Sequence, residues 1–170
     1  PIREVDAIIH LVRCFESEKI THVNSKISPV EDLETIKTEI ILSDLDIVQK
    51  KLEKSKKKFL EEKEIKILEE KSDMLNRGEE VRINDINEEK FLSSIGLLSI
   101  KPKIIVCNVD EENISRGNKY TQDVKKKYPN EKIINICADI EDQLSGLDRN
   151  EKENFMKDIG LNKTGLNKLI

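Results

Sequence analysis

Hydrophobic residues along this chain follow two different patterns. Short, mostly apolar runs occur near both ends, at 7–12, 104–107 and 132–137, within otherwise polar sequence. Such runs are typical of strands that are covered on both faces of a parallel sheet. Helical patterns at 120–128 and 150–159 alternate with them, so the ends of the chain predict βαβ units.

The middle of the chain has the period of an amphipathic helix instead. Ser28 and Pro29 suit a helix N-terminus, and apolar residues then recur at spacings that continue as a coiled-coil seam. A second apolar stripe ends near Gly78, which suits the C-terminal stop of a helix. An antiparallel hairpin that reverses between residues 54 and 64 explains both stripes, and one continuous helix to Asn76 is the alternative.

Together the two patterns predict an α/β fold, in which an α-helical coiled-coil hairpin interrupts the parallel sheet of a nucleotide-binding domain. Residues 1–28 and 99–160 are expected to form that discontinuous domain. Residues 29–98 are expected to form the helical insert, and residues 161–170 to begin the connection to a further domain.

Composition adds to this picture without indicating a nucleic-acid-binding domain. Charged residues make up 38% of the chain and concentrate in the middle, so we expect the insert to bury only a narrow seam. The net charge of −4 gives no overall basic footprint. The sequence shows neither a signal peptide nor an apolar segment of membrane length, so we expect a cytoplasmic protein without a membrane partner.

The cysteines and histidines predict neither disulfides nor a metal site. Cys14, Cys107 and Cys137 lack C-x-x-C spacing, so we expect small buried thiols in a reducing compartment. Whether one of them senses oxidation stays open. His10 has no second histidine at metal-ligand spacing and is expected to be a core or edge residue.

The main candidate for chemistry is the polar loop after the strand at 104–107. Ligands of parallel α/β sheets bind at the carboxyl ends of strands, which is where Asn108 is predicted to lie. We expect adenine to be read by the Asn108 amide and the backbone of Val109, with the Val109 side chain packing on the base. Glu111 is longer than the Asp of guanine-reading N-K-x-D loops and is expected to withhold guanine specificity. An ordinary acidic helix-start loop explains the same N-x-x-E spacing.

Two further groups of residues are candidates for binding. Cys137 and Ala138 follow the next buried strand, where backbone N–H groups reach a base; an ordinary strand exit is the alternative. A basic run at 50–58 is suited to ribosomal RNA or another polyanion, although the solvated face of a coiled coil explains it as well. Its members are Lys50, Lys51, Lys54, Lys56, Lys57 and Lys58.

Long stretches of the chain also resemble a known family. IREVDAIIHLVRCFE, ITHV and SPVEDLETIKTEIILSDLDIVQKKLEK resemble the middle of the YchF family of Obg-like P-loop ATPases, as do NVDEE and ADIEDQLSGLDRNEKENFMKDIGLNKTGLNKLI. The resemblance is weakest at 55–90. It implies the C-terminal half of a G-type nucleotide-binding domain, and a preference for ATP over GTP that accompanies the N-x-x-E loop. It also implies Asn108, Val109 and Glu111 as base-site residues, ATP with Mg²⁺ in the intact protein, and the ribosome as partner.

The sequence departs from that family where the triphosphate would be held. Nothing in it matches G-x-x-x-x-G-K-[ST], and neither the switch segments nor the C-terminal TGS domain of the family is present. Phosphoryl transfer depends on such phosphate and metal contacts. We therefore expect this chain alone to hydrolyse no ATP and to hold no nucleotide or Mg²⁺ tightly.

A non-catalytic helical adaptor, whose α/β part is only a scaffold, is the alternative function. Nucleic acid is a candidate partner of the helical arm under either view. Unpaired edges of a partial sheet also invite association, so we expect that this chain can form a dimer without physiological meaning.

Overall fold

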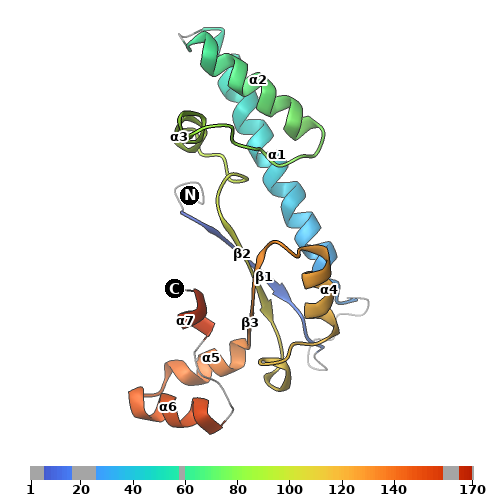
Figure 1. The fold of residues 1–170 in the computed structure, drawn as a ribbon, viewed down its shortest axis with the longest axis vertical. Coiled ribbons are helices and arrows are strands. Elements are labelled where there is room, and N and C mark those ends of the chain that lie inside the picture. Colours follow the sequence, from blue (N-terminus) through green and yellow to red (C-terminus); the bar gives the residue numbers. More distant parts are fainter. Residues whose placement is uncertain (1–5, 17–25, 58–59, 159–164, 170) are drawn as a thin grey trace. The chain divides into compact units, whose positions relative to one another are not determined.

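The computed structural model of this protein describes residues 6–16, 26–57, 60–158 and 165–169. The chain divides into two compact units. The helical unit comprises residues 1–8 and 34–102, and the sheet unit comprises residues 9–33 and 103–170. The helices and strands follow one another as β1 (Ile8–Arg13), α1 (Pro29–Ser55), α2 (Glu62–Asn76), α3 (Ile86–Ser94), β2 (Lys103–Asn108), the 3₁₀ helix η1 (Glu111–Asn113), α4 (Lys119–Lys127), β3 (Lys132–Ile136), α5 (Ala138–Ser145), α6 (Arg149–Asp158) and α7 (Gly165–Leu169), as Figure 1 shows.

Three parallel strands form the sheet, in the order β1-β2-β3. In the pairing of β2 with β3, Ile104 lies opposite Lys132 and Asn108 lies opposite Ile136. At the end of β1, the N–H of Cys14 donates to the carbonyl of Asn108, with an N–O distance of 2.8 Å. All three strands therefore end at the same edge of the sheet, and the predicted α/β fold is confirmed.

Alternation along the strands gives the sheet unit its core. Ile105 and Cys107 point to one face of β2, where they are buried with Val12 of β1 and Val124 of α4. Helix α7 lies beside β3 on the opposite face. Its Gly165 packs so closely on Ile136 that an added Cβ would collide with that side chain. Covering helices on both faces explain why the strands read as mostly apolar runs.

All three cysteines are buried, free thiols, as the sequence predicts. Cys14 and Cys107 come from neighbouring strands and are both 0% exposed. The hydrogen bond between their side chains, together with burial, raises the pKa of the Cys14 thiol. Cys14 is therefore kept in its protonated, unreactive form.

The helical hairpin is confirmed, and the alternative of one continuous helix is wrong. Helix α1 ends at Ser55 and α2 begins at Glu62, so the chain reverses within the predicted interval. Val48 of α1 and Leu68 of α2 are both 0% exposed and lie in one apolar core. Gly78 follows α2 with φ of 74°, a conformation that favours glycine.

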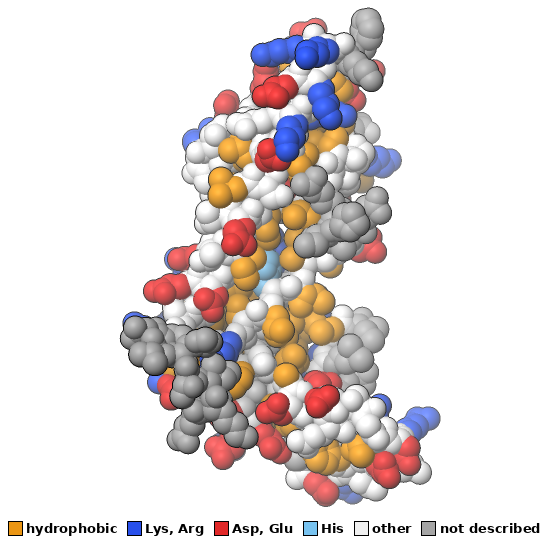
Figure 2. All heavy atoms as spheres, turned by 180° about the vertical axis from the view of Figure 1, so that it is seen from behind, with side chains coloured by type: hydrophobic (Ala, Val, Ile, Leu, Met, Phe, Trp, Pro, Cys, Tyr) orange, Lys and Arg blue, Asp and Glu red, His pale blue; other side chains and the backbone are white. Residues whose placement is uncertain are grey.

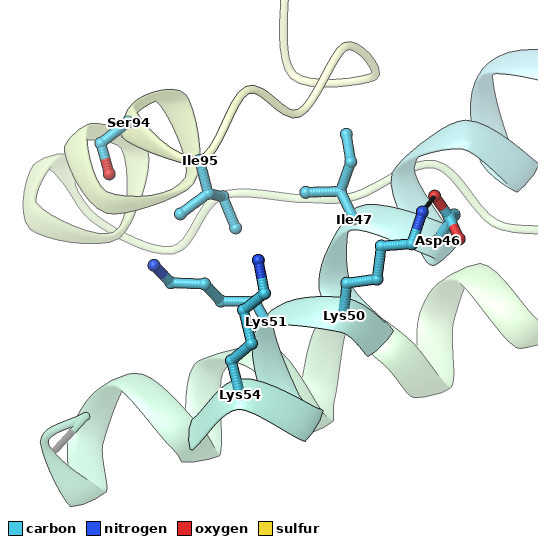
Figure 3. A pocket seen from close by; sticks show the side chains of 7 residues that line it. All are labelled: Asp46, Ile47, Lys50, Lys51, Lys54, Ser94 and Ile95. Carbon is cyan, nitrogen blue, oxygen red and sulfur yellow. Dashed lines mark hydrogen bonds and ion pairs between the residues drawn. The ribbon is translucent and has the colours of Figure 1, made fainter. Parts of the chain in front are cut away.

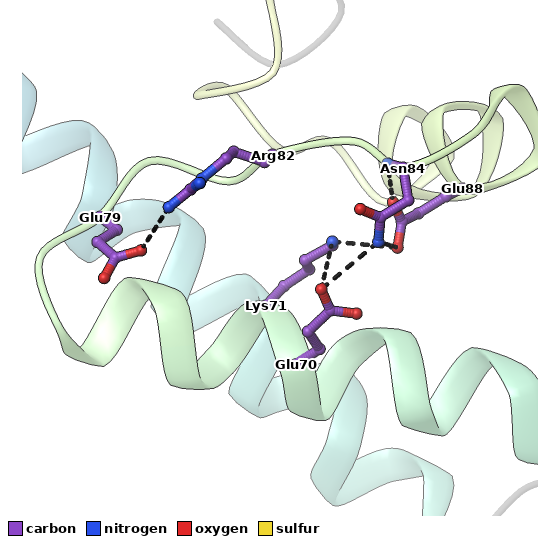
Figure 4. A network of polar contacts seen from close by, with 6 residues as sticks. All are labelled: Glu70, Lys71, Glu79, Arg82, Asn84 and Glu88. Atoms are coloured by element: carbon purple, nitrogen blue, oxygen red, sulfur yellow. Dashed lines mark hydrogen bonds and ion pairs between the residues drawn. The ribbon is translucent and has the colours of Figure 1, made fainter.

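Buried charged side chains of the hairpin also bind α3 and the segment that follows it. The Asp44 carboxylate is 0% exposed and accepts hydrogen bonds from the N–H groups of Leu98 and Ser99, each at 2.8 Å. Figure 4 shows a second network, in which the Lys71 ammonium lies 3.1 Å from the Glu88 carboxylate. These contacts hold α3 and the segment after it against α1 and α2.

Candidate functional site

The carboxyl ends of β2 and β3 bring two of the predicted base-reading positions together. Asn108 is the last residue of β2, and Ala138 is the first residue of α5. The Ala138 N–H donates to the Asn108 side-chain oxygen Oδ1, at a distance of 3.0 Å. Asn108 is half-buried and Ala138 is exposed, so the pair lies at the surface of the sheet unit.

This hydrogen bond determines what the pair can offer a ligand. It occupies the backbone donor of Ala138 and one lone pair of the Asn108 amide oxygen. An amide oxygen has a second lone pair, and the Nδ2 group carries two donor hydrogens. Among the described residues none accepts a hydrogen bond from Asn108 Nδ2, so the side chain presents a free lone pair of Oδ1 beside the N–H donors of Nδ2.

The structure corrects the role expected of Val109. Its side chain is 1% exposed and belongs to the core of the sheet unit, and its N–H donates to the carbonyl of Ile136 at 2.7 Å. The backbone pairing with β3 thus continues one residue past Asn108, and strand alternation turns Val109 to the same buried face as Cys107. In this conformation Val109 anchors the loop, and its side chain does not pack on a base.

Cys137 is likewise a core residue, with its side chain 3% exposed. Its carbonyl accepts the N–H of Glu141 and so starts α5 at the edge of the sheet. Any contribution of this position to binding comes from its backbone.

Glu111 lies on the surface and is the first residue of η1. Within the described part of the chain its carboxylate forms no hydrogen bond or ion pair. The turn that contains Glu111 is closed by Asp110, whose carboxylate accepts from Asn113 Nδ2. The structure therefore brings Asn108 and Ala138 together. Glu111 follows Asn108 by three residues and makes no contact of this kind with either of them.

Comparison with known proteins identifies the kind of protein to which this site belongs. No family model matches the chain. The ribosome-binding ATPase YchF of Haemophilus influenzae is 34% identical over 178 residues, which cover 99% of this chain and 49% of that protein. YchF of Mycoplasma genitalium is 36% identical over 185 residues, with the same coverage of both chains. The structure of the Schizosaccharomyces pombe YchF GTPase superposes with a TM-score of 0.82 at 28% identity, over 99% of this chain and 49% of that one.

The comparisons support the assignment of this chain as a part of a YchF/Obg-like P-loop protein. It spans about half the length of the YchF proteins that it matches. The resemblance noted in the sequence is thereby confirmed over almost all of the chain. Structural agreement with a YchF protein also supports the reading of the sheet unit as part of a P-loop G domain.

The lysines of the basic run in the helical hairpin have different environments in the structure. Lys50 forms an ion pair with Asp46, at 2.8 Å, whereas Lys51 and Lys54 line a groove beside it, as Figure 3 shows. Lys56 and Lys57 follow α1 in an exposed turn, and Lys58 lies outside the described residues. Figure 2 shows Lys and Arg side chains gathered over the end of the helical hairpin.

One positioning residue near the strand ends was missed from the sequence. Asn118 caps α4 by accepting the N–H groups of Tyr120 and Thr121. Its Nδ2 group also donates to the carbonyl of Cys14, at 2.6 Å, and so ties α4 to the end of β1. The Asn-x-x-Thr spacing signals the cap, but no local pattern predicts the contact with Cys14.

The described residues contain neither a metal-binding cluster nor a membrane-crossing helix. No group of three or more His, Cys, Asp or Glu side chains is arranged to hold a metal ion in this part of the chain. No described helix combines the length and apolar character that a bilayer requires.

Proposed function

We propose that this chain is the base-recognition part of a cytoplasmic P-loop protein that binds and hydrolyses ATP and associates with the ribosome. The observation that carries this proposal is the Asn108–Ala138 hydrogen bond at the carboxyl ends of two parallel strands. The names of the YchF relatives, given as ribosome-binding ATPases, support the activity and the partner. The domain limits of this proposal are residues 1–28 with 99–160, the helical insert at 29–98, and the connection at 161–170.

The free groups of Asn108 match the exposed edge of adenine. An Asn side chain pairs with adenine through a donor to N7 and an acceptor for the N6 amino group. Asn108 Oδ1 can accept the amino group with its second lone pair while it keeps the Ala138 N–H, so adenine requires no rearrangement.

Guanine meets the same pair less well. Its O6 is an acceptor, so it faces the Asn108 oxygen without a hydrogen between them. The Ala138 N–H, which O6 would need instead, is already donated to Asn108. Glu111 adds to the preference because its longer side chain spoils the two-bond acceptance that an Asp gives to guanine.

Phosphoryl transfer itself depends on groups other than the described residues. Mg²⁺ neutralises charge on the phosphates when it accompanies ATP, and the described side chains form no cluster that would hold it. The contribution of this chain is to orient the base and to exclude the wrong one. By itself, it is expected to release no phosphate from ATP.

The proposal is tested by the base preference of the longer protein that includes this chain. Calorimetric titration with ATP and with GTP should show tighter binding of ATP. Asn108→Ala should reduce the ATP/GTP preference about tenfold, because a bidentate amide–adenine pair discriminates by roughly 1–3 kcal/mol.

Asn113→Ala is the matched control. Asn113 lies in the same loop, and its side chain bonds only to Asp110 among the described residues. It should leave the preference unchanged. If Asn108→Ala also leaves the preference unchanged, the assignment of base recognition to Asn108 is refuted.

A non-catalytic adaptor remains the second candidate because the helical unit has an apolar core of its own. The measurements separate the two candidates. An adaptor would retain its partner when Asn108 is replaced and would bind neither nucleotide in the longer protein.

A further inference from the structure

The outer edge of β3 carries a groove that base recognition does not use. β3 is the last strand of the described sheet, because the strand order is β1-β2-β3. The groove encloses about 420 Å³ and is lined by residues 132–135 of β3, by Ile114 and Ser115 before α4, and by Lys168 of α7. It therefore runs along an edge strand and is bordered by segments from both faces of the sheet.

The backbone of β3 alternates between its neighbour β2 and this groove. The Ile136 carbonyl accepts the Val109 N–H at 2.7 Å, so Ile136 turns its backbone groups toward β2. Successive residues of a strand direct these groups to opposite sides, so Ile134 also faces β2 while Ile133 and Asn135 face outward. Within the described part of the chain, no group bonds to the outward N–H and C=O groups. The edge therefore presents an unpaired donor and acceptor at every second residue.

Two lysines give the groove a positive charge. Lys132 lies on β3 and is exposed, and Lys168 lies on α7. Among the described residues neither ammonium group has an ion-pair partner, and none of the side chains that line the groove is a carboxylate. Lysine suits a phosphate as well as a carboxylate, so the charge by itself does not select the ligand.

We propose that this edge binds an extended, acidic segment of a partner protein, which adds a strand to the sheet beside β3. The unpaired backbone selects a polypeptide, because an extended chain offers alternating N–H and C=O groups at the spacing of β3. Charge then selects among polypeptides, since carboxylates beside Lys132 and Lys168 gain favourable contacts. Ile133 and Ile134 point to opposite faces of the strand, so each gives an apolar neighbour to alternate side chains of the added strand.

A second copy of this chain fits the same edge less well. β3 contributes Lys132 and no carboxylate, so pairing of two β3 strands adds like charges without a compensating partner on either strand. Lysine on an edge strand is a common device against edge-to-edge association. An acidic segment removes the repulsion that a second copy creates. This inference goes beyond base recognition and is independent of it.

The test is amide hydrogen exchange, followed by nuclear magnetic resonance of the isotope-labelled 170-residue chain with the acidic peptide EVTVTE. At a peptide concentration of about ten times Kd, exchange of the Ile133 and Asn135 amides should slow about tenfold, because only the free protein then exposes them. The Ile134 amide already faces β2 and should be unaffected. It is an internal control, because its residue lies between the other two.

Backbone pairing and charge are tested separately. The same peptide, N-methylated at its central residues, keeps its carboxylates but loses its donors, and it should bind at least about tenfold more weakly. Lys132→Glu should weaken binding of EVTVTE about fivefold and strengthen binding of KVTVTK by a similar factor, because it reverses the charge beside the added strand. Lys126→Glu reverses an exposed charge on α4 and should leave both affinities unchanged.

Several outcomes would overturn the proposal. Equal binding of the N-methylated peptide would show attraction by charge alone, and unchanged exchange at Ile133 and Asn135 would place the peptide elsewhere. Slower exchange at these two amides with rising protein concentration, without peptide, would identify a second copy as the occupant. The same protection in the longer protein that includes this chain, without peptide, would identify another segment of that protein.

Asn108→Ala should leave the affinity for EVTVTE unchanged. A failure of this proposal is thereby separated from a failure of base recognition.

Discussion

The helical unit and the sheet unit both use charged side chains to join distant segments, but they place them in opposite environments. In the helical unit, the side chains of Lys71 and Glu88 are 0% and 4% exposed. In the sheet unit, Lys119 and Glu16 join α4 to the segment after β1 and are 72% and 70% exposed. A Lys–Glu ion pair is therefore part of the interior in the helical unit and lies on the surface in the sheet unit.

The difference follows from how much apolar surface each unit can bury. Parallel strands and their helices supply the sheet unit with a broad apolar core, and its polar contacts remain at strand ends and caps. A two-helix seam covers less area, so the helical unit completes its interior with a carboxylate and an ion pair. Buried polar groups of this kind must be fully paired.

The largest effect is expected from breaking the buried pair of the helical unit. Lys71→Met keeps the length of the side chain but leaves the Glu88 carboxylate buried without its cation. We expect a loss of about 3–5 kcal/mol in the free energy of unfolding, measured by urea denaturation.

The exposed pair between Lys66 and Glu62 gives the control, since its side chains are 72% and 85% exposed. Lys66→Met should cost at most about 0.5 kcal/mol. Adding Glu88→Leu to Lys71→Met should recover part of the loss, because no unpaired charge remains. Equal losses for Lys71→Met and Lys66→Met would show that burial does not distinguish the two networks.

The sequence predicted the elements of both units far better than these networks. Apolar runs and helix caps are local signals, and they placed the hairpin reversal and the strands that end at Asn108 and Ile136. Lys71 lies in a stretch dense with charges and carries no signal that marks it as buried. Lys71 can be buried because it pairs with Glu88, which lies in the next helix, α3.

The sequence also predicted the candidate site only in part. Position at the end of a strand was enough to select Asn108 and Ala138, and the structure joins them. Val109 was misassigned because the sequence does not reveal that pairing with β3 continues one residue past Asn108. That single hydrogen bond decides whether the side chain faces a ligand or the core.

An intermediate effect is expected at two glycines that have the same backbone angle in different surroundings. Gly78 in the helical unit and Gly117 in the sheet unit both have φ of 74°. A Cβ at Gly78 would meet no atom within 4 Å, whereas at Gly117 it would collide with Thr121 Oγ1. Thr121 is 1% exposed and has little room to move.

Gly78→Ala should therefore cost only the backbone strain, about 1 kcal/mol in the free energy of unfolding. Gly117→Ala should cost about 1–3 kcal/mol more because of overpacking against Thr121. The comparison is made by urea denaturation of both variants. A smaller loss for Gly117→Ala would show that the cap of α4 is more loosely packed than the structure indicates.

The smallest effect is expected at the exposed network of the sheet unit, where it is best detected as a titration. The Tyr120 hydroxyl donates to the Glu16 carboxylate, which raises the pKa of Tyr120 and lowers the pKa of Glu16. Tyr120 should thus ionise above the usual range of a tyrosine, as followed by phenolate absorbance in a Tyr128→Phe background, which leaves one tyrosine.

Glu16→Gln should bring the ionisation of Tyr120 back toward the ordinary value, because an uncharged amide no longer favours the protonated phenol. Thermal stability should change little, since both partners are exposed to solvent. If instead Glu16→Gln destabilised the chain as much as Lys71→Met, surface and buried networks would be equivalent here. The distinction between the two units would then lie in the segments that the charges join and not in how deeply they are buried.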